Sequence, residues 1–320
     1  MISAHGWIYN NMDKPSRIVI TGASGWIGRS VVKTLIRIYG TDILEKIELY
    51  GTSSRDLKLT SGITINVRKL QSISTSGEIN LFVPLAFQTQ DKLNEMSKFE
   101  YIQKNKDLIE LHSKIIQDHA IERAVFFSSG IVTMSPNDLE RTESYWVYKE
   151  LKTLEENVFF ENFSKQSTNV AACRLFSVSG SEMQDPKKYA LGDFLLCAMA
   201  KRRITLNSQK QIYRKYVDIE DICESLIKET NSNKSMTLIE SGGIKLTLLE
   251  LARNVSQIFE LGEEFLVKVD ESNLESDHYY STSLGMEDLF AKHSIHALNL
   301  EQQIRKTAAG LHENGFVSYG

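Results

Sequence analysis

The chain has 320 residues, enough for one large α/β domain or for a binding domain with a smaller second lobe. Hydrophobic residues make up 42% and charged residues 24%, a globular balance that argues against extensive disorder. The net charge of −4 disfavours nucleic acid as the main partner, and no apolar run is long enough to predict a membrane span.

The N-terminal residues 1–16 are polar and lack the apolar stretch of a secretory signal, so we interpret them as a short extension. Cys173, Cys197 and Cys223 are far apart in apolar segments, which is typical of buried free thiols in a cytoplasmic protein. None of the seven histidines is paired with Cys or Glu at metal-ligand spacing, and no metal site is predicted.

The first half of the chain alternates β-branched runs with segments of helical periodicity. Predicted strands cover 17–21, 47–50, 63–67, 79–83, 123–127 and 169–175, and predicted helices cover 26–39, 99–119 and 145–160. Strands joined by helical crossovers pair in parallel, with helices on both faces of the sheet. The pattern therefore predicts a Rossmann-like, doubly wound α/β fold, with a dinucleotide-binding domain over 17–179.

After Ser179 the pattern loosens into single strands and helices with hydrophobic runs of their own. We expect helices at 191–201, 219–229, 246–259 and 301–311, and strands at 212–217 and 236–240. No low-complexity linker separates this part from the first. Residues 180–320 are therefore predicted to form a smaller α/β lobe that binds the substrate.

A glycine-rich turn follows the first predicted strand and opens the first predicted helix. Gly22 permits a tight turn, Gly25 lets the backbone approach a pyrophosphate, and Gly28 lets the helix pack closely on the sheet. The helix N-terminus offers free N–H groups to the phosphates. A glycine turn without a ligand is the alternative, but the position after the first strand favours dinucleotide binding, with Ser24, Trp26 and Ile27 also predicted to contact it.

The end of the second predicted strand bears on the choice of dinucleotide. Glu48 has about the right spacing for the acid of an NAD site, but it lies within the strand. The strand ends instead at Ser53, Ser54 and Arg55, which suit a ribose 2′-phosphate better than a 2′-hydroxyl. We therefore favour NADP(H), with NAD(H) as the alternative if Arg55 is merely a solvated side chain.

A candidate catalytic set follows the fifth predicted strand. Ser129 ends this strand, and Tyr145 and Lys149 stand four residues apart in the next helix, on one face. A nearby ammonium favours the phenolate, which makes a tyrosine usable as an acid or base. Ser129 is predicted to hydrogen-bond the same substrate oxygen. A surface Tyr–Lys pair beside a loop serine is the alternative interpretation.

With these motifs the sequence resembles the extended short-chain dehydrogenases/reductases, specifically the NAD-dependent epimerase/dehydratase family of nucleotide-sugar enzymes. The resemblance implies a triad of Ser129, Tyr145 and Lys149, with Lys149 also holding the nicotinamide ribose. It further implies that Leu85 and Ala86 lie beside the cofactor and that Asn105 is a structural asparagine.

Two later segments extend the resemblance. The run Arg174 to Gly180 is similar to the family's Arg-x-x-Asn-Val-x-Gly segment, which implies cofactor contacts for Phe176 and Val178 and a substrate contact for Ser177. The run Arg214 to Asp221 looks like the segment whose arginine binds the substrate diphosphate, so Arg214 is expected to have this role.

The departures from the family's sequence pattern narrow the range of reactions that we expect. Gly130 and Ile131 follow Ser129 where 4,6-dehydratases have an Asp-Glu pair, so dehydration is not expected. A keto-sugar reductase is favoured, and a nucleotide-sugar 4-epimerase with tightly bound NAD, a reductase of a non-sugar carbonyl and a non-catalytic dinucleotide-binding regulator remain as alternatives. Many extended members pair through helices next to the triad, so the helices at 99–119 and 145–160 are candidate homodimer faces.

Overall fold

The computed structural model describes residues 13–74, 76–135, 143–208, 210–232, 236–268 and 276–316. Most of the predicted extension, residues 1–12, lies outside this part. The described chain divides into two compact units. The first comprises the residues up to Leu57, Thr64–Leu175 and Glu224–Ile239, and the second comprises Lys58–Ile63, Phe176–Cys223 and the residues from Glu240 onward. Each unit is described by itself.

An eight-stranded sheet forms the centre of the first unit, in the order β11-β7-β6-β5-β1-β2-β4-β3. Each pairing between β7, β6, β5, β1, β2 and β4 is parallel, and in register Ile18 lies opposite Ile47 on one side and Leu81 on the other. This confirms the predicted Rossmann-like α/β fold. The strands are β1 (Ile18–Thr21), β2 (Ile47–Gly51), β3 (Arg55–Lys58), β4 (Thr64–Lys69), β5 (Glu78–Val83), β6 (Ala120–Ser129), β7 (Asn169–Leu175) and β11 (Met236–Glu240).

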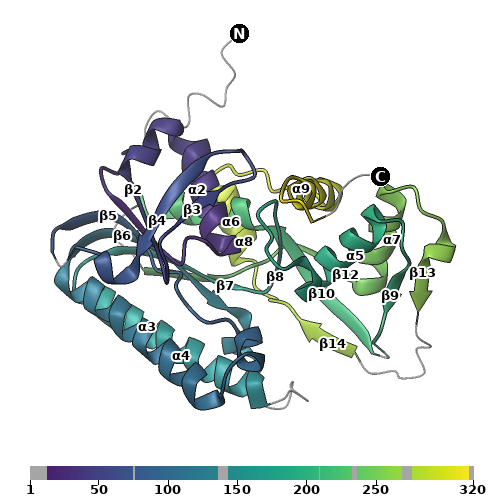
Figure 1. Cartoon of the computed structure of the whole chain (residues 1–320), viewed down its shortest axis with the longest axis horizontal. Coiled ribbons are helices and arrows are strands. Elements are labelled where there is room, and N and C mark those ends of the chain that lie inside the picture. The colour runs from purple at the N-terminus through teal and green to yellow at the C-terminus, as the bar shows by residue number, and fades with distance from the viewer. Residues whose placement is uncertain are drawn as a thin grey trace, which may run out of the picture. The chain divides into compact units, whose positions relative to one another are not determined.

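Helices cover both faces of this sheet (Figure 1). Helices α3 (Lys98–Asp118) and α4 (Glu143–Ser164) lie side by side on one face, and α2 (Trp26–Tyr39) lies on the other. Between the sheet and the α3/α4 pair, aromatic side chains from both layers form a fully buried cluster that includes Phe82, Phe126 and Phe159. Each such side chain contributes about 1.5–3 kcal/mol of hydrophobic stabilisation.

Two strands of the large sheet differ from the sequence expectation. The segment Met236–Glu240 was expected in the smaller lobe, but as β11 it joins the large sheet beside β7. The pattern of a short strand indicates that it pairs with another strand but does not indicate which one. Here the preceding helix α6 (Ile219–Glu229) returns the chain to the first unit. In that unit Glu224 forms an ion pair with Arg37 of α2 at 2.8 Å. The unpredicted strand β3 begins at Arg55 and buries only Leu57, so it carries too little apolar pattern to be recognised.

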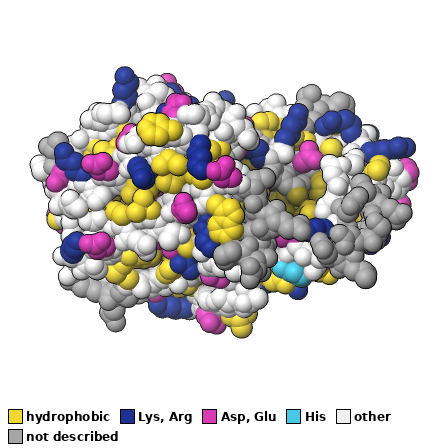
Figure 2. Space-filling view, turned by 90° about the horizontal axis from the view of Figure 1, so that it is seen from below, with side chains coloured by type: hydrophobic (Ala, Val, Ile, Leu, Met, Phe, Trp, Pro, Cys, Tyr) yellow, Lys and Arg dark blue, Asp and Glu magenta, His cyan; other side chains and the backbone are white. Residues whose placement is uncertain are grey.

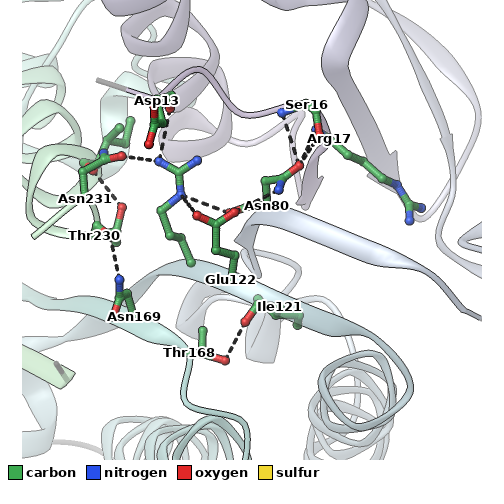
Figure 3. Close-up of polar contacts among 12 residues, drawn as sticks. Asp13, Ser16, Arg17, Asn80, Ile121, Glu122, Thr168, Asn169, Thr230 and Asn231 are labelled. Atoms are coloured by element: carbon green, nitrogen blue, oxygen red, sulfur yellow. Dashed lines mark hydrogen bonds and ion pairs between the residues drawn. The ribbon is translucent and has the colours of Figure 1, made fainter. Parts of the chain in front are cut away.

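A polar network joins the amino ends of the parallel strands (Figure 3). Arg123 is 3% exposed, and its guanidinium donates to the Asn80 carbonyl at 3.3 Å and to the Asn231 side chain. The Asn169 amide donates to the Thr230 carbonyl at 3.2 Å. These contacts satisfy buried backbone groups at this edge.

The second unit contains a smaller sheet of β8 (Ser177–Ser179), β10 (Gln211–Asp218), β12 (Ile244–Thr247) and β14 (Ser276–Tyr279), with β10 paired to each of the others. Strands β9 (Ile204–Leu206) and β13 (Leu266–Lys268) form a separate pair. The helices α5 (Ala190–Met199), α7 (Leu248–Ile258), α8 (Gly285–Lys292) and α9 (Leu300–Glu313) accompany them. The predicted boundary between 179 and 180 itself stays a prediction.

The surface of the first unit mixes hydrophobic and charged side chains on the face that carries α3 and α4 (Figure 2). Phe99 on α3 is 79% exposed and Leu154 on α4 is 38% exposed. Pairing of two copies through these helices stays a prediction. No helix within the described residues is both long and apolar enough to cross a membrane.

Candidate active site

The glycine turn lies at the carboxyl end of β1, against the backbone that follows β5. Gly22 has φ +63°, and a Cβ there would lie 2.5 Å from the Leu85 carbonyl carbon. A Cβ at Gly28 would lie 2.6 Å from the Ala23 Cα, so this glycine permits close packing of α2. Gly25 differs, because its Cβ would meet only the Gly22 carbonyl oxygen, at 3.5 Å. Gly22 and Gly28 are therefore required by packing, whereas the structure around Gly25 leaves room for a ligand.

The N-terminus of α2 fits the pyrophosphate of a dinucleotide. Gly25 is the N-cap residue and supplies no side-chain cap, and the first turn of the helix contains no acidic residue. The first N–H groups of a helix have no partner within it and carry a partial positive charge. The N-terminus of α2 is therefore chemically suited to bind an anion.

A buried threonine fixes the position of the Leu85–Ala86 step. The Thr21 Oγ1 accepts the Leu85 N–H at 3.0 Å and the Ala86 N–H at 3.3 Å. With both lone pairs used, the Thr21 hydroxyl proton is donated to His112 Nε2, 2.8 Å away. Burial, and then the Lys152 charge, lowers the pKa of His112 to about 3, so the ring stays a neutral acceptor. The predicted cofactor step is thus held beside the glycine turn.

Phe87, which follows the Leu85–Ala86 step, contacts Tyr148, and Tyr148 in turn contacts Ser129. The Phe87 ring meets the Tyr148 ring edge-on with centroids 6.0 Å apart, and Tyr148 hydrogen-bonds the Ser129 side chain. Ser129 is 9% exposed at the end of β6, where its Oγ also accepts the Ile131 N–H at 3.3 Å. Burial raises the pKa of Tyr148 to about 12, although the Ser129 hydrogen bond opposes this rise.

Tyr148 belongs to a second Tyr-x-x-x-Lys pair that sequence reasoning missed. Lys152 stands four residues later on α4, is 8% exposed, and has its Nζ 4.1 Å from the Phe87 ring centroid. It donates to Glu155 Oε2 at 2.7 Å. One turn further along, Glu156 binds the Arg174 guanidinium through two bonds of 2.9 and 2.7 Å. The sequence signal for the second pair was the overlap of two Tyr-x-x-x-Lys spacings in one helix. In the structure, the buried Glu155 after Lys152 marks the face of α4 that points inward.

The predicted Tyr145 and Lys149 have different surroundings. Tyr145 is partly buried. The Lys149 ammonium donates to the Met134 carbonyl and lies 5.5 Å from the Trp146 ring centroid. Of the predicted catalytic residues, Ser129 therefore contacts Tyr148, which was not predicted, and Lys149 contacts the loop after β6.

The residues predicted at the end of β2 are arranged next to the glycine turn. Arg55 donates to the Ser24 Oγ at 2.5 Å, which brings two predicted cofactor residues together. Ser53 and Ser54 are exposed in the connection to β3. Glu48 accepts from Arg17 and Tyr50 at 2.8 and 2.6 Å and is also bonded to Arg68. Burial opposes ionisation of Glu48, yet these hydrogen bonds and the two arginines hold its pKa below its usual range, so the carboxylate is already engaged in the protein.

Asn105 has the buried partner that its place on an apolar helix face required. It is 0% exposed on α3, its Oδ1 accepts the Gln88 N–H at 2.8 Å, and its amide donates to the Gln88 carbonyl at 3.3 Å. The Tyr101 hydroxyl donates to the same carbonyl at 2.9 Å. The asparagine thus anchors the loop that carries Ala86 and Phe87.

The remaining predicted residues lie in the second unit. Phe176 donates its N–H to the Ser241 Oγ at 2.9 Å, and Ser177 and Val178 form β8 in parallel register with Tyr216 and Val217. The Arg214 guanidinium is bonded to the Asp277 carboxylate at 3.0 Å and lies 5.6 Å from the Tyr279 ring centroid. The Tyr279 ring is in turn 5.0 Å from Phe176, so the structure connects the predicted cofactor and substrate residues of this unit.

The second unit also contains a pocket that sequence reasoning did not find. Its volume is about 300 Å³, and its lining includes Lys187, Lys188, Lys210, Phe194, Leu206 and Leu248. Apolar side chains with a few cations are a suitable lining for a ligand that has a flat ring and a negative charge. This pocket has little signal in the sequence, because its lining comes from α5, β9, β10 and α7 together.

Comparisons with known proteins agree with the fold. The sequence profile of the NAD dependent epimerase/dehydratase family matches residues 18–236. A UDP-N-acetylglucosamine 4-epimerase from Methanobrevibacter ruminantium, solved with UDP-N-acetylmuramic acid, is similar at TM-score 0.70 and 19% identity, over 94% of this chain and 99% of that one. No curated protein matches the sequence.

Two further solved structures are similar. DesIV, a dTDP-glucose 4,6-dehydratase from Streptomyces venezuelae with NAD and TYD bound, has TM-score 0.69 and 15% identity, over 93% and 97% of the two chains. The Bordetella bronchiseptica enzyme WbmF in complex with NAD+ has TM-score 0.66 and 15% identity, over 93% of each.

The fold and the glycine turn define a dinucleotide-binding enzyme of the extended short-chain dehydrogenase/reductase type. The chain belongs to the NAD dependent epimerase/dehydratase family.

Proposed function

We propose that this enzyme transfers a hydride at a carbonyl or hydroxyl carbon of a nucleotide-diphosphate sugar and that it works as a keto-sugar reductase. The observation that carries the proposal is the Ser129–Tyr148 hydrogen bond at the carboxyl end of β6. Phe87 connects this pair to the Leu85–Ala86 step, which Thr21 binds to the glycine turn. An acid/base group and a dinucleotide cradle are thereby neighbours in one unit.

We propose further that Tyr148 and Lys152, and not Tyr145 and Lys149, complete the catalytic set with Ser129. The bound dinucleotide would supply or accept the hydride. In the reductive direction Tyr148 donates its phenol proton to the carbonyl oxygen, the C=O bond becomes a C–OH bond, and solvent reprotonates the phenolate. Ser129 hydrogen-bonds the same oxygen and stabilises its developing charge.

The cofactor that this site favours is NADP(H). Arg55 at the glycine turn offers a cation beside Ser24, and Glu48 already binds two arginines. A free acid at the end of β2 would have repelled a 2′-phosphate, whereas Arg55 attracts it. NAD(H) is the alternative, because similar solved proteins contain NAD.

The second unit supports the proposed substrate class. Arg214 presents a guanidinium of the kind that binds a diphosphate. It donates to the carbonyls of Tyr213 and Asp277 and to the Asp277 carboxylate, and an anionic ligand can replace the carboxylate. The pocket with three lysines offers room for a ring and further cations. The similar M. ruminantium epimerase was solved with a UDP-sugar, which supports a nucleotide sugar here.

A matched pair of variants tests the catalytic assignment. We expect Tyr148→Phe to abolish turnover of a panel of keto-sugar nucleotides while the dinucleotide still binds, and Tyr145→Phe to retain most activity. Full activity of Tyr148→Phe together with loss in Tyr145→Phe would restore the first Tyr-x-x-x-Lys pair. Activity in both variants would remove the tyrosine mechanism.

A second measurement separates reductase from 4-epimerase. The purified protein is denatured and the released nucleotide is identified by absorbance and mass. An empty protein that binds NADPH supports the reductase, because a reductase exchanges its cofactor every turnover. Released NAD that does not exchange would show an epimerase that recycles its own hydride.

A further inference from the structure

Glu155 is a buried carboxylate beside the proposed catalytic set, and the mechanism above does not use it. It is 2% exposed on α4, and its Oε2 lies 2.7 Å from the Lys152 Nζ. Both members of this ion pair are withdrawn from water, so each depends on the other for its charge. Burial is the larger influence on Glu155 and raises its pKa, against the opposing effect of Lys152.

The ion pair with Glu155 changes the effect of Lys152 on the pKa of Tyr148. A free ammonium near a phenol favours the phenolate and lowers its pKa. Here the Glu155 carboxylate accepts from that ammonium at 2.7 Å, and the ammonium also lies 4.1 Å from the Phe87 ring centroid. After burial and the Ser129 hydrogen bond, the Glu155 charge is the next influence on Tyr148, and it opposes ionisation of the phenol.

Other charged and titratable groups also face this cluster from neighbouring elements. Asp91, in the short 3-10 helix Gln90–Asn94 after β5, raises the pKa of Tyr148, and Glu156 raises that of Glu155. His112 on α3 is kept neutral by burial and by Lys152. These groups, with Tyr101 on α3 and with Arg174 on β7 bound to Glu156, make up the surroundings in which Glu155 acts.

We propose that Glu155 is a positioning residue for the Ser129–Tyr148 pair, whose carboxylate holds Lys152 in place and opposes loss of the Tyr148 phenol proton. The inference rests on the proposed function for its catalytic meaning. A phenol with a raised pKa stays protonated to higher pH, so Glu155 extends the pH range over which Tyr148 holds the proton that carbonyl reduction requires.

The test is the ionisation of Tyr148 in the protein without substrate. Stopped-flow pH jumps record the tyrosinate absorbance before alkaline unfolding begins, and subtraction of the same record from a Tyr148→Phe background isolates Tyr148. At the pH where a phenol ionises, Glu155 is charged. We expect Glu155→Gln to lower the Tyr148 midpoint by about one pH unit.

Two further variants make the result specific. Glu150→Gln removes an exposed carboxylate from the same helix and is expected to leave the midpoint unchanged. Glu155→Asp withdraws the carboxylate by one methylene group and is expected to give an intermediate midpoint, which decides the question if the glutamine variant does not fold. A purely structural role would change the melting temperature of the Glu155 variants and leave the Tyr148 midpoint where it is.

An unchanged or raised midpoint in folded Glu155→Gln, or in folded Glu155→Asp when the glutamine variant does not fold, would overturn the proposal. The outcome is separable from that of the proposed function. A lowered midpoint in an enzyme whose Tyr148→Phe variant remains active would support the electrostatic coupling and reject the catalytic role of Tyr148.

Discussion

Three glycine-to-alanine substitutions can separate packing from ligand binding in the turn after β1. Gly22 and Gly62 both have positive φ, of +63° and +82°, but a Cβ at Gly62 would meet no atom within 4 Å. Gly62→Ala is therefore expected to cost only the left-handed strain of roughly 1–2 kcal/mol. Gly22→Ala adds a contact of 2.5 Å with the Leu85 backbone, which cannot rotate away, and is expected to cost roughly 2–5 kcal/mol in total.

Gly25→Ala is expected to behave in the opposite way. Its new Cβ meets one oxygen at 3.5 Å, an ordinary contact, so the free energy of unfolding falls by about 1 kcal/mol or less from the poorer N-cap. The methyl group would nevertheless stand at the uncapped end of α2, where the pyrophosphate has to approach. We expect the dinucleotide affinity to fall by more than about tenfold, or about 1.4 kcal/mol.

Denaturant unfolding and titration with NADPH and NADH measure both quantities on the same three variants. Equal stability losses in Gly22→Ala and Gly62→Ala would refute the packing of the turn on the Leu85–Ala86 backbone. Wild-type dinucleotide affinity in Gly25→Ala would refute the pyrophosphate cradle, whatever the stability results.

Three more substitutions test separate parts of the site. Arg55→Ala is expected to weaken NADPH by about tenfold, since it removes a charge-assisted bond, and NADH hardly at all; equal effects in the two titrations would remove the preference for NADP(H). Arg214→Ala is expected to weaken nucleotide-sugar binding by about 10- to 100-fold in calorimetry, and binding that is unaffected would exclude a diphosphate contact. Asn105→Ala leaves the Gln88 N–H without its acceptor and is expected to cost about 1–3 kcal/mol of unfolding free energy, against about 0.5 kcal/mol or less for the exposed Gln103→Ala; similar losses would contradict the anchoring role.

The parts of the fold that sequence could predict are those specified by local pattern. The run Ile18 to Thr21 is fully buried in the centre of a parallel sheet, and its unbroken apolar character indicated that position. The helix Trp26–Tyr39 begins after a glycine and has a strong amphipathic repeat, so its limits were predicted correctly. The partner of β11 could not be predicted, because strand pattern carries no information about which edge receives the strand.

Long-range contacts also determine the roles of residues that the sequence alone left open. The engagement of Glu48 depends on Arg17 and Arg68, which come from two other segments, so spacing alone left its role open. Asp277 and Tyr279 bind Arg214 from a strand whose residues show little apolar pattern. A motif shows which chemistry a residue type can perform, and the contacts of the folded chain decide whether the side chain is available.

The two tyrosines of α4 show this limit most clearly. Both stand four residues before a lysine, so the spacing argument applies equally to Tyr145–Lys149 and to Tyr148–Lys152. Positions three residues apart differ by only about 60° around a helix, so amphipathic pattern separates them poorly. The Ser129 hydrogen bond favours Tyr148, and the burial of Lys152 under Phe87 points the second pair inward. A lysine that is buried needs a counter-charge. Glu155 supplies that charge, so the feature that distinguishes the second pair is also the one that we infer to control the proton of its tyrosine.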